Sequence, residues 1–175
     1  MRRVVCGVIE GKSVVLSDGK APTEHAFAAL PGHVSSIMWG TAADPSSEPI
    51  AEAAPVGVRA VPGPGETRLL LAHFPPASVM FGKGFDPIEA EREQLMHLPG
   101  LAELFEPDCP GMHRTQSIDY DIVIEGQLWL ELDDGKEVEL CAGDVAVQQG
   151  TRHAWRNKSD APATVAFILV STARP

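Results

Sequence analysis

The sequence predicts an all-β fold, a sandwich or barrel built mainly from short strands. The chain of 175 residues contains 16 glycines and 15 prolines, which interrupt it too often for a helical bundle. Between these breaks lie short runs rich in valine, isoleucine and leucine, whereas a clear helical pattern is confined to one stretch. At this length we expect one domain with a hydrophobic core of its own.

Four strands are expected in the first half of the chain. Each is a short apolar run bounded by turn residues, and the first two, separated by a glycine and followed by Asp18-Gly19, should pair. The expected strands are 2–8, 13–17, 35–41 and 67–74. Residues 41–57 are rich in Ala, Pro and Ser and are expected to form an exposed loop.

One helix is expected at residues 87–98. Asp86 has the character of an N-cap, Pro87 stands at the first helical position, and Pro99-Gly100 ends the pattern. The next few residues could add a turn or two of helix. We expect the helix to pack on the outside of the β structure.

The remainder of the chain reads as one strand after another. Asp134-Gly135 predicts a hairpin turn, and Gly126 and Gly143 are interpreted as turn glycines. The strands are expected at 116–126, 127–132, 136–141, 144–150, 153–157 and 164–170. Their short, even spacing without βαβ alternation favours a β-meander that closes on itself as a sandwich or barrel.

Composition argues against several classes of partner. The formal net charge of −10, without a basic cluster, would repel nucleic acid and anionic membranes, and no apolar run approaches the length of a membrane span. The three cysteines have no CxxC spacing and are odd in number, which fits a reducing cytoplasm. We therefore expect a cytoplasmic protein whose partner is a small molecule.

A row of polar side chains precedes and enters the expected strand 116–126. Residues two apart in a strand face the same side, so four of them should point together into the interior. They are His113, Thr115, Ser117 and Asp119. His153, on a later strand, can reach the same place. Because buried polar groups need partners, this pattern predicts a pocket with room for one small ligand.

Residues 113–157 resemble the two sequence motifs of the cupin family. The first motif is matched by His113, Thr115, Asp119 and Gly126, with threonine in place of the second histidine and aspartate in place of glutamate. The second motif is matched by Gly143, Asp144, Gly150, His153 and Asn157, with Gln148 in the position of the usual proline. The same variant motifs occur in a bacterial subgroup of small single-domain cupins.

The resemblance implies a cupin-type, RmlC-like jelly-roll β-barrel with one or two peripheral helices. It implies a single domain over residues 1–175, with N-terminal strands and a loop at 1–84, a helical insertion at 86–105 and the core motifs at 112–171. It also implies a homodimer, because cupins commonly dimerise and unpaired strand edges favour pairing. A simpler alternative for Asp119 is an ion pair with Arg114 or Arg152 in place of a role in the pocket.

The predicted function is that of a small-molecule enzyme assisted by a divalent metal. His113, Asp119 and His153 are the predicted metal ligands and catalytic residues, holding Fe, Mn, Zn or Ni to polarise a carbonyl or enol oxygen. Lyase, isomerase and oxygenase chemistry all remain open. Without a metal, either histidine could act as general base with Asp119 orienting its ring. A non-catalytic pocket that binds a small metabolite is the alternative from another class.

Further residues are predicted to contact the substrate. Thr115 and Ser117 share the inward face, while Gln148 offers an amide near the second motif. Trp39 and His73 are expected to reach the pocket from the N-terminal strands. Trp155 is interpreted as a packing aromatic, and His33 has no partner at an informative spacing.

Overall fold

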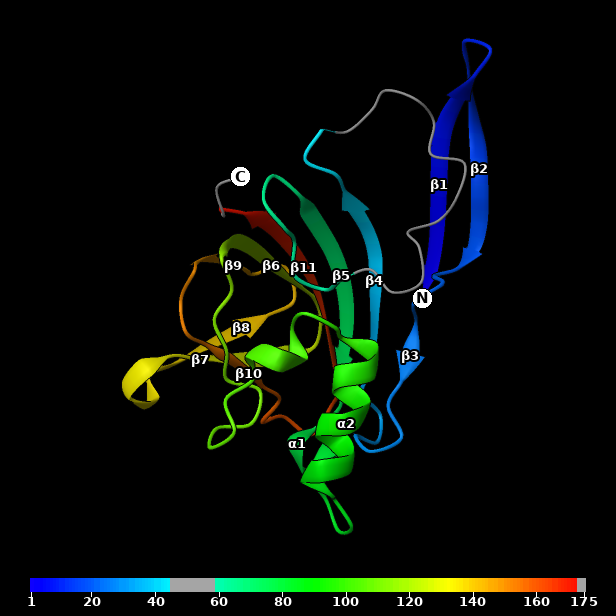
Figure 1. The fold of residues 1–175 in the computed structure, drawn as a ribbon. Helices are drawn as coiled ribbons and strands as arrows, with labels where there is room; N and C mark the ends of the chain where they lie inside the picture. The colour runs from blue at the N-terminus through cyan, green and yellow to red at the C-terminus, as the bar shows by residue number, and fades with distance from the viewer. Residues whose placement is uncertain (45–58, 173–175) are drawn as a thin grey trace.

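The computed structural model describes residues 1–44 and 59–172. The loop predicted at 41–57 lies for the most part outside these residues. The described strands form a six-stranded sheet, a three-stranded sheet and a separate hairpin, all antiparallel. Figure 1 shows the two larger sheets stacked against each other, with the helices gathered at one end of the molecule.

The largest sheet has six strands. Its strand order is β3-β4-β5-β11-β6-β9. The strands are β3 (His25–Ala26), β4 (Val34–Thr41), β5 (Thr67–Phe74), β6 (Ser117–Glu125), β9 (Val145–Gln149) and β11 (Ala163–Ser171). The C-terminal strand β11 therefore lies in the middle of the sheet, between a strand from the N-terminal half and β6.

The three-stranded sheet has the order β10-β7-β8. It consists of β7 (Gln127–Glu131), β8 (Glu137–Cys141) and β10 (Ala154–Arg156). A short 3-10 turn, η2 (Asp133–Gly135), joins β7 to β8, and the positive φ angles of Asp134 (59°) and Gly135 (69°) suit the twist of a tight hairpin. The hairpin predicted at Asp134-Gly135 is confirmed.

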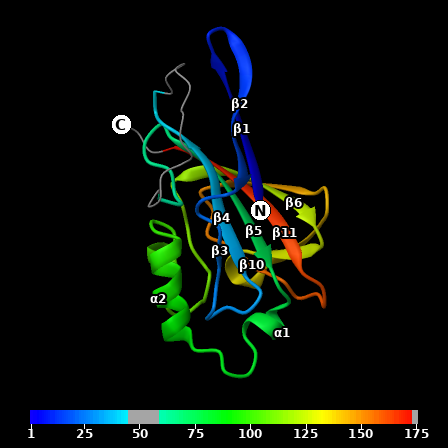
Figure 2. The ribbon, with the colours of Figure 1, turned by 90° about the vertical axis from the view of Figure 1, so that its right-hand side faces the viewer.

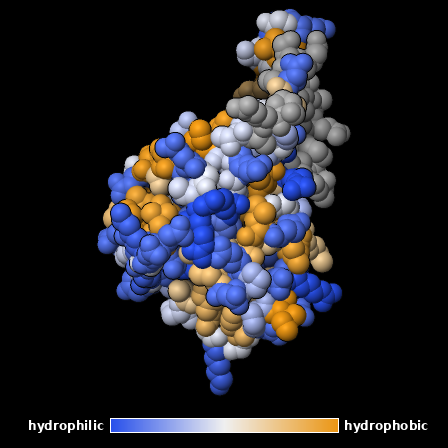
Figure 3. Space-filling view, turned by 60° about the vertical axis from the view of Figure 1, so that its left-hand side comes forward, coloured by the Kyte–Doolittle hydropathy of each residue, from blue (hydrophilic) through white to orange (hydrophobic). Residues whose placement is uncertain are grey.

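The first two strands stand apart from the sheets. β1 (Arg2–Ile9) pairs with β2 (Lys12–Lys20), and this hairpin projects from the body (Figures 1 and 2). Large apolar side chains remain exposed on it, including Val8 and Val15. In the space-filling view, exposed apolar side chains form several separate patches between polar ones (Figure 3).

The helices are α1 (Ala77–Met80), α2 (Pro87–His97) and the 3-10 turn η1 (Ala102–Leu104). Asp86 caps α2 by accepting from the backbone N–H groups of Ile88 and Glu89, and Pro87 occupies the first turn, as predicted. α2 has 11 residues, and none of the helices in the described ranges is long and apolar enough to cross a membrane.

A mostly β fold with peripheral helices is confirmed, but the predicted meander is wrong. Successive strands alternate between sheets: β6 belongs to the large sheet, β7 and β8 to the small one, β9 to the large one and β10 to the small one. This alternation is that of a jelly roll, and the two sheets are not closed into a continuous barrel. Within the described ranges, an isolated backbone bridge between His113 and His153 joins the segment before β6 to the segment before β10.

Two apolar clusters form the core. One lies under α2 and includes Phe27, Leu70 and Leu98, and the other lies between the two sheets and includes Val123 and Leu128. The first cluster borders the candidate site, because Leu70 and Leu98 line its cavity together with buried polar side chains.

Candidate functional site

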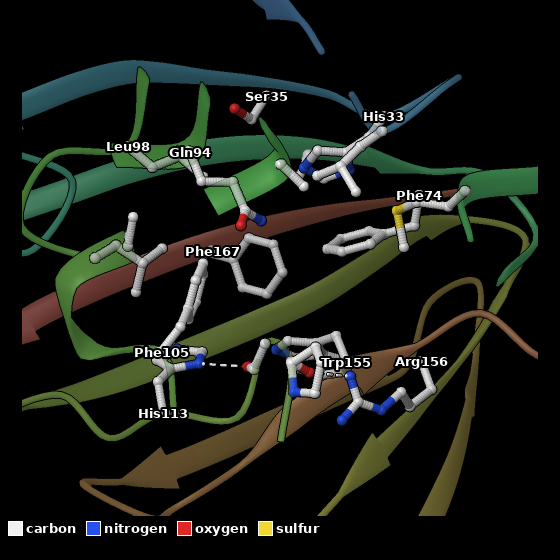
Figure 4. Close-up of a pocket in the computed structure, with 18 of the residues that line it drawn as sticks. His33, Ser35, Phe74, Gln94, Leu98, Phe105, His113, Trp155, Arg156 and Phe167 are labelled. Carbon is white, nitrogen blue, oxygen red and sulfur yellow. Dashed lines mark hydrogen bonds between the residues drawn. The ribbon is translucent and has the colours of Figure 1, made fainter. Parts of the chain in front are cut away.

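A cavity of about 330 Å³ lies where the two sheets and the helical segment meet. Much of its wall is apolar, formed by β5, β11, α2 and the loop at 105–111, with Leu70, Phe105 and Phe167 among the lining residues. Figure 4 shows Phe74, Phe105 and Phe167 lying between two groups of polar side chains. The helix predicted to pack outside is therefore also a wall of the cavity, because Ala90, Gln94 and Leu98 line it.

The predicted histidines His113 and His153 lie together at one end of the cavity. Each backbone N–H donates to the carbonyl of the other at 2.9 Å, so the two residues form a hydrogen-bonded pair across adjacent segments. Their rings are 4.4 Å apart between centroids and tilted by 52°. Both side chains are buried, and both line the cavity.

The hydrogen bonds of the two rings fix their tautomers. Nδ1 of His113 is 2.9 Å from the carbonyl oxygen of Gly111, and Nδ1 of His153 is 3.0 Å from that of Thr151. A carbonyl oxygen only accepts, so each neutral ring carries its proton on Nδ1 and leaves Nε2 as the basic nitrogen. The pair therefore presents two oriented bases to the cavity.

Burial keeps both rings neutral. Burial, followed by the nearby His153, lowers the pKa of His113 to about 4, against smaller raising effects that begin with the Gly111 carbonyl. Burial also lowers the pKa of His153, while the Thr151 carbonyl raises it. Both histidines are thus unprotonated near neutral pH.

A chain of hydroxyl groups leads from Ser117 to Asp119. Ser117 Oγ donates to Thr115 Oγ1 at 2.8 Å, and Thr115 Oγ1 donates to Asp119 Oδ2 at 3.3 Å. Burial raises the pKa of Asp119, while these two hydroxyls and His113 lower it. Thr115 and Asp119 line the cavity, and Oδ1 of Asp119 is buried without a hydrogen-bond partner. Asp119 does not pair with Arg114, which is exposed whereas Asp119 is buried, or with Arg152, which bonds Glu106 and Asp133 instead.

Asp121 is a second buried acid on the same face of β6. It is 1% exposed, it lines the cavity, and neither carboxyl oxygen has a hydrogen-bond partner. Burial and then the charge of Asp119 raise its pKa to about 8, although the Gln148 amide lowers it. That amide approaches without completing a hydrogen bond, since Gln148 Nε2 is itself unpartnered. Asp121 is therefore a neutral acid, a proton donor, near pH 7.

Ion pairs hold the loop at 105–111 against the three-stranded sheet. Arg152 donates to Glu106 at 2.7 Å through Nε and to Asp133 at 2.9 Å. Arg156 donates to Glu131 and to the carbonyl of Pro110, both at 2.7 Å. Because Phe105 on this loop packs edge-on against His113 with ring centroids 5.4 Å apart, the pairs also fix one wall of the site.

Four of the residues predicted to contact substrate lie outside the cavity lining. The β4–β5 register is irregular between Ile37 and Trp39, and Trp39 does not line the cavity. Cζ of Arg3 lies over the Trp39 ring, 5.7 Å from its centroid. His73 faces Thr164, with 3.2 Å between Nδ1 and Oγ1. Ser117 is buried behind Thr115, and Gln148 accepts a hydrogen bond from Thr151. The expected positions of Trp39 and His73 at the pocket are wrong.

Several residues of the site were not among those predicted. Asp121 continues the parity of Thr115 and Asp119, so the alternation of β6 contained the signal that could have identified it. His33 and Trp155 also line the cavity, although the first was set aside and the second was interpreted as packing alone. Trp155 does pack, with its ring 5.6 Å from that of Phe167.

The predicted ligands of a divalent metal are His113, Asp119 and His153, and such a site requires these three side chains to converge. All three line one cavity, and both imidazoles present an unprotonated Nε2, which suits a ligand. However, no three His, Cys, Asp or Glu side chains within residues 1–44 and 59–172 are grouped closely enough to hold a metal ion. The predicted three-ligand set is therefore not formed, and the chemistry below is derived from the side chains alone.

Sequence comparisons identify relatives of part of the chain. The cupin domain family matches residues 105–170. Oryzines biosynthesis cluster protein J of Aspergillus oryzae is 43% identical over 72 residues, which cover 41% of this chain and 40% of that protein. Phomopsin biosynthesis cluster protein C' of Diaporthe leptostromiformis is 58% identical over 67 residues, covering 35% of each chain. Cupin-domain-containing oxidoreductase srdB of Neurospora crassa is 31% identical over 108 residues, covering 53% of this chain and 55% of that protein. The chain thus spans about half or less of the curated relatives it matches.

Solved structures of cupins are also similar to the chain, at low identity. The cupin domain of an XRE family transcriptional regulator from Enterobacter cloacae aligns with a TM-score of 0.37 and 14% identity, over 61% of this chain and 83% of that one. An RmlC-like cupin family protein with a double-stranded β-helix fold from Methanocaldococcus jannaschii aligns with a TM-score of 0.39 and 11% identity, over 60% and 70%. The similarity to the cupin domain family covers residues 105–170, the segment that carries both His113 and His153.

Proposed function

We propose that this protein is a small-molecule enzyme that moves protons at a carbonyl or enol group of a neutral, largely apolar substrate. The observation that supports it most is the pair His113 and His153: two buried neutral imidazoles, each with Nδ1 bonded to a carbonyl, at one end of an apolar cavity. A general base needs to be unprotonated, oriented and within reach of its substrate.

The acid partner in this proposal is Asp121. Abstracting a proton next to a carbonyl creates negative charge on the carbonyl oxygen, and a neutral carboxylic acid can donate a hydrogen bond to that oxygen. The raised pKa of Asp121, near 8 through burial and the charge of Asp119, supports this role. One histidine would remove the proton while Asp121 stabilises the enol oxygen. Thr115 would orient Asp119 and keep the floor of the site ordered.

The names of the relatives support an enzymatic role in general terms. Several are called cupin-domain-containing oxidoreductases, and others belong to biosynthesis clusters. The apolar lining, with Leu70, Phe105 and Phe167, supports a hydrophobic substrate. Fold by itself would be equally compatible with binding alone, so the two imidazoles carry the enzymatic assignment.

Deuterium exchange tests the proposal. 2-Tetralone and 2-indanone are neutral bicyclic ketones small enough for this cavity, and exchange at their α-carbons is followed by NMR in D₂O. We expect the protein to accelerate exchange, and replacement of the histidine that acts as the base, by His113→Gln or by His153→Gln, to lower the rate by about a hundredfold. His73→Gln is the matched control, because His73 lies outside the cavity lining and should keep the rate. Exchange no faster than with free imidazole for both ketones, or unaltered in both active-site variants, would overturn the proposal.

A further inference from the structure

The cavity has a second polar end, formed by His33, Ser35 and Gln94. All three line the same cavity as His113. Figure 4 shows His33 and Ser35 on one side of Phe167 and Phe74, with His113 and Trp155 on the other, while the Gln94 amide projects inward from α2. The cavity is therefore polar at both ends and aromatic in the middle.

His33 is held rigidly with an unused hydrogen-bonding atom. It is 6% exposed, and its Nδ1 is buried without a partner. The backbone of His33 donates to Leu30 at 2.9 Å and accepts from Phe27 at 3.0 Å, and its ring lies between the rings of Phe27 (4.9 Å) and Phe74 (5.1 Å). An unpartnered buried nitrogen costs stability unless a ligand or water bonds it.

The charge state of this end limits what it can bind. Burial lowers the pKa of His33 to about 4, against a raising effect of the His73 backbone, so the ring is neutral near pH 7. Ser35 and Gln94 are neutral as well. Such a set has donors and acceptors but no charge, which suits a hydroxyl or carbonyl oxygen and not an anion.

With the cavity taken as the substrate site, as in the proposed function, we infer that His33, Ser35 and Gln94 bind an oxygen substituent on the far end of an aromatic substrate. The substrate class is then a neutral aromatic compound with oxygen groups at both ends. One end lies at His113 and His153, where proton transfer takes place. The other end is held by the second polar group and sets the orientation of the ring system between Phe74 and Phe167.

Calorimetric titration with 2-naphthol and 2,6-dihydroxynaphthalene tests this inference. The two probes share one ring system and differ by one hydroxyl group at the far end. We expect the native protein to bind the diol about tenfold more tightly than 2-naphthol. This factor is the upper end of the affinity gain from one neutral hydrogen bond. Ser35→Ala, His33→Leu and Gln94→Leu should each reduce that preference to about twofold or less. Three separate variants keep the test decisive if one of them fails to fold.

Ser36→Ala provides the matched control. Ser36 is the next residue on β4 and is 2% exposed, but its hydroxyl lies 3.1 Å from Thr23 Oγ1 and it does not line the cavity. The diol preference should survive this change. The inference is overturned if the native protein binds neither probe, if it binds both equally, or if Ser36→Ala abolishes the preference as fully as Ser35→Ala does. Loss of ketone exchange with a retained diol preference would count against the proposed function alone.

Discussion

His113 and His153 bond each other through their backbones and lie ring beside ring, with centroids 4.4 Å apart. This single pairing joins the two motif segments of the chain and brings two basic Nε2 atoms to one end of an apolar cavity. The closeness has an electrostatic consequence, because protonation of one ring opposes protonation of the other. Burial and His153 together lower the pKa of His113 to about 4.

The first prediction concerns the pH dependence of ketone exchange. With a pKa near 4, His113 stays unprotonated in mild acid, and Asp121 stays protonated below its pKa of about 8, so the rate should remain level between about pH 7 and pH 5. Free imidazole, which protonates near pH 6.5, should lose most of its activity over the same range. Exchange of 2-tetralone measured at several pH values checks this. A midpoint near 6.5 for the protein would show that the histidines titrate as if they were exposed.

The second prediction is that Asp121 makes the stability fall as the pH rises from about 4 to about 8. Its pKa is raised by burial, then by Asp119, to about 8, whereas an unfolded aspartate titrates near 4. Between these values the folded state binds the extra proton, so stability must fall as pH rises toward 8. From pH 6 to pH 8 the free energy of unfolding should drop by about 2 kcal/mol.

Asp121→Asn isolates this effect. The amide has nearly the same shape and no titrating proton, so the difference between the two proteins should change by that amount over the same pH range. Urea unfolding at pH 6 and pH 8 measures it, and groups common to both proteins cancel. Parallel pH profiles for the native protein and the variant would show that Asp121 is already ionised at pH 6.

A pair of turn glycines offers a test of the fold. Gly126 has φ of 77°, and a Cβ built on it would lie 2.4 Å from the carbonyl oxygen of Pro162, which belongs to the backbone. Gly126→Ala combines an unfavourable dihedral with a backbone clash and should destabilise by about 3 kcal/mol or more. Gly135 has φ of 69° but open space around it, so Gly135→Ala should cost only about 1–2 kcal/mol. Equal losses in urea unfolding would contradict the close approach at Gly126.

The next prediction is that Arg156 supports ligand binding by holding the loop at 105–111 in place. Its guanidinium bonds both Glu131 and the carbonyl of Pro110, so Arg156→Met should release the loop from the sheet. Amide exchange at residues 107–112 should become faster, and 2-naphthol should bind several-fold more weakly, as expected for lost charge-assisted hydrogen bonds. Arg92→Met is the control, because Arg92 forms an exposed ion pair with Glu89 on α2. Unchanged amide exchange in Arg156→Met would show that the loop is held by other contacts.

Local patterns in the sequence predicted most of the strands, the helix and the inward row of β6. Alternating polarity is a property of each strand by itself, so the burial of His113, Thr115 and Asp119 followed from parity. The capping residues of α2 are similarly local. The meander was wrong because local patterns do not specify which sheet a strand joins.

The parts of the site that depend on distant contacts were not predicted. Trp39 shares its expected parity with Ile37, but the irregular register between them removes Trp39 from the cavity, and nothing in the sequence marks that irregularity. His33 enters the cavity because β4 pairs with β5, with Val34 opposite His73. The wall formed by α2 depends on how the helix folds back over the sheet. Asp121 is different, since its parity was visible and only its role was overlooked.

The last prediction concerns metal. Protein metal sites with open positions use three side-chain ligands, and the side chains grouped here supply two imidazoles without an adjoining third donor. Two neutral imidazoles alone hold a divalent ion weakly, so protein purified without chelator should contain well below one equivalent of metal. Treatment with EDTA should leave ketone exchange unchanged. Metal analysis of the native protein beside His113→Ala and His153→Ala checks both statements. One equivalent in the native protein that both variants lose would mean that Asp119, whose Oδ1 is unpartnered, moves to complete the ligand set.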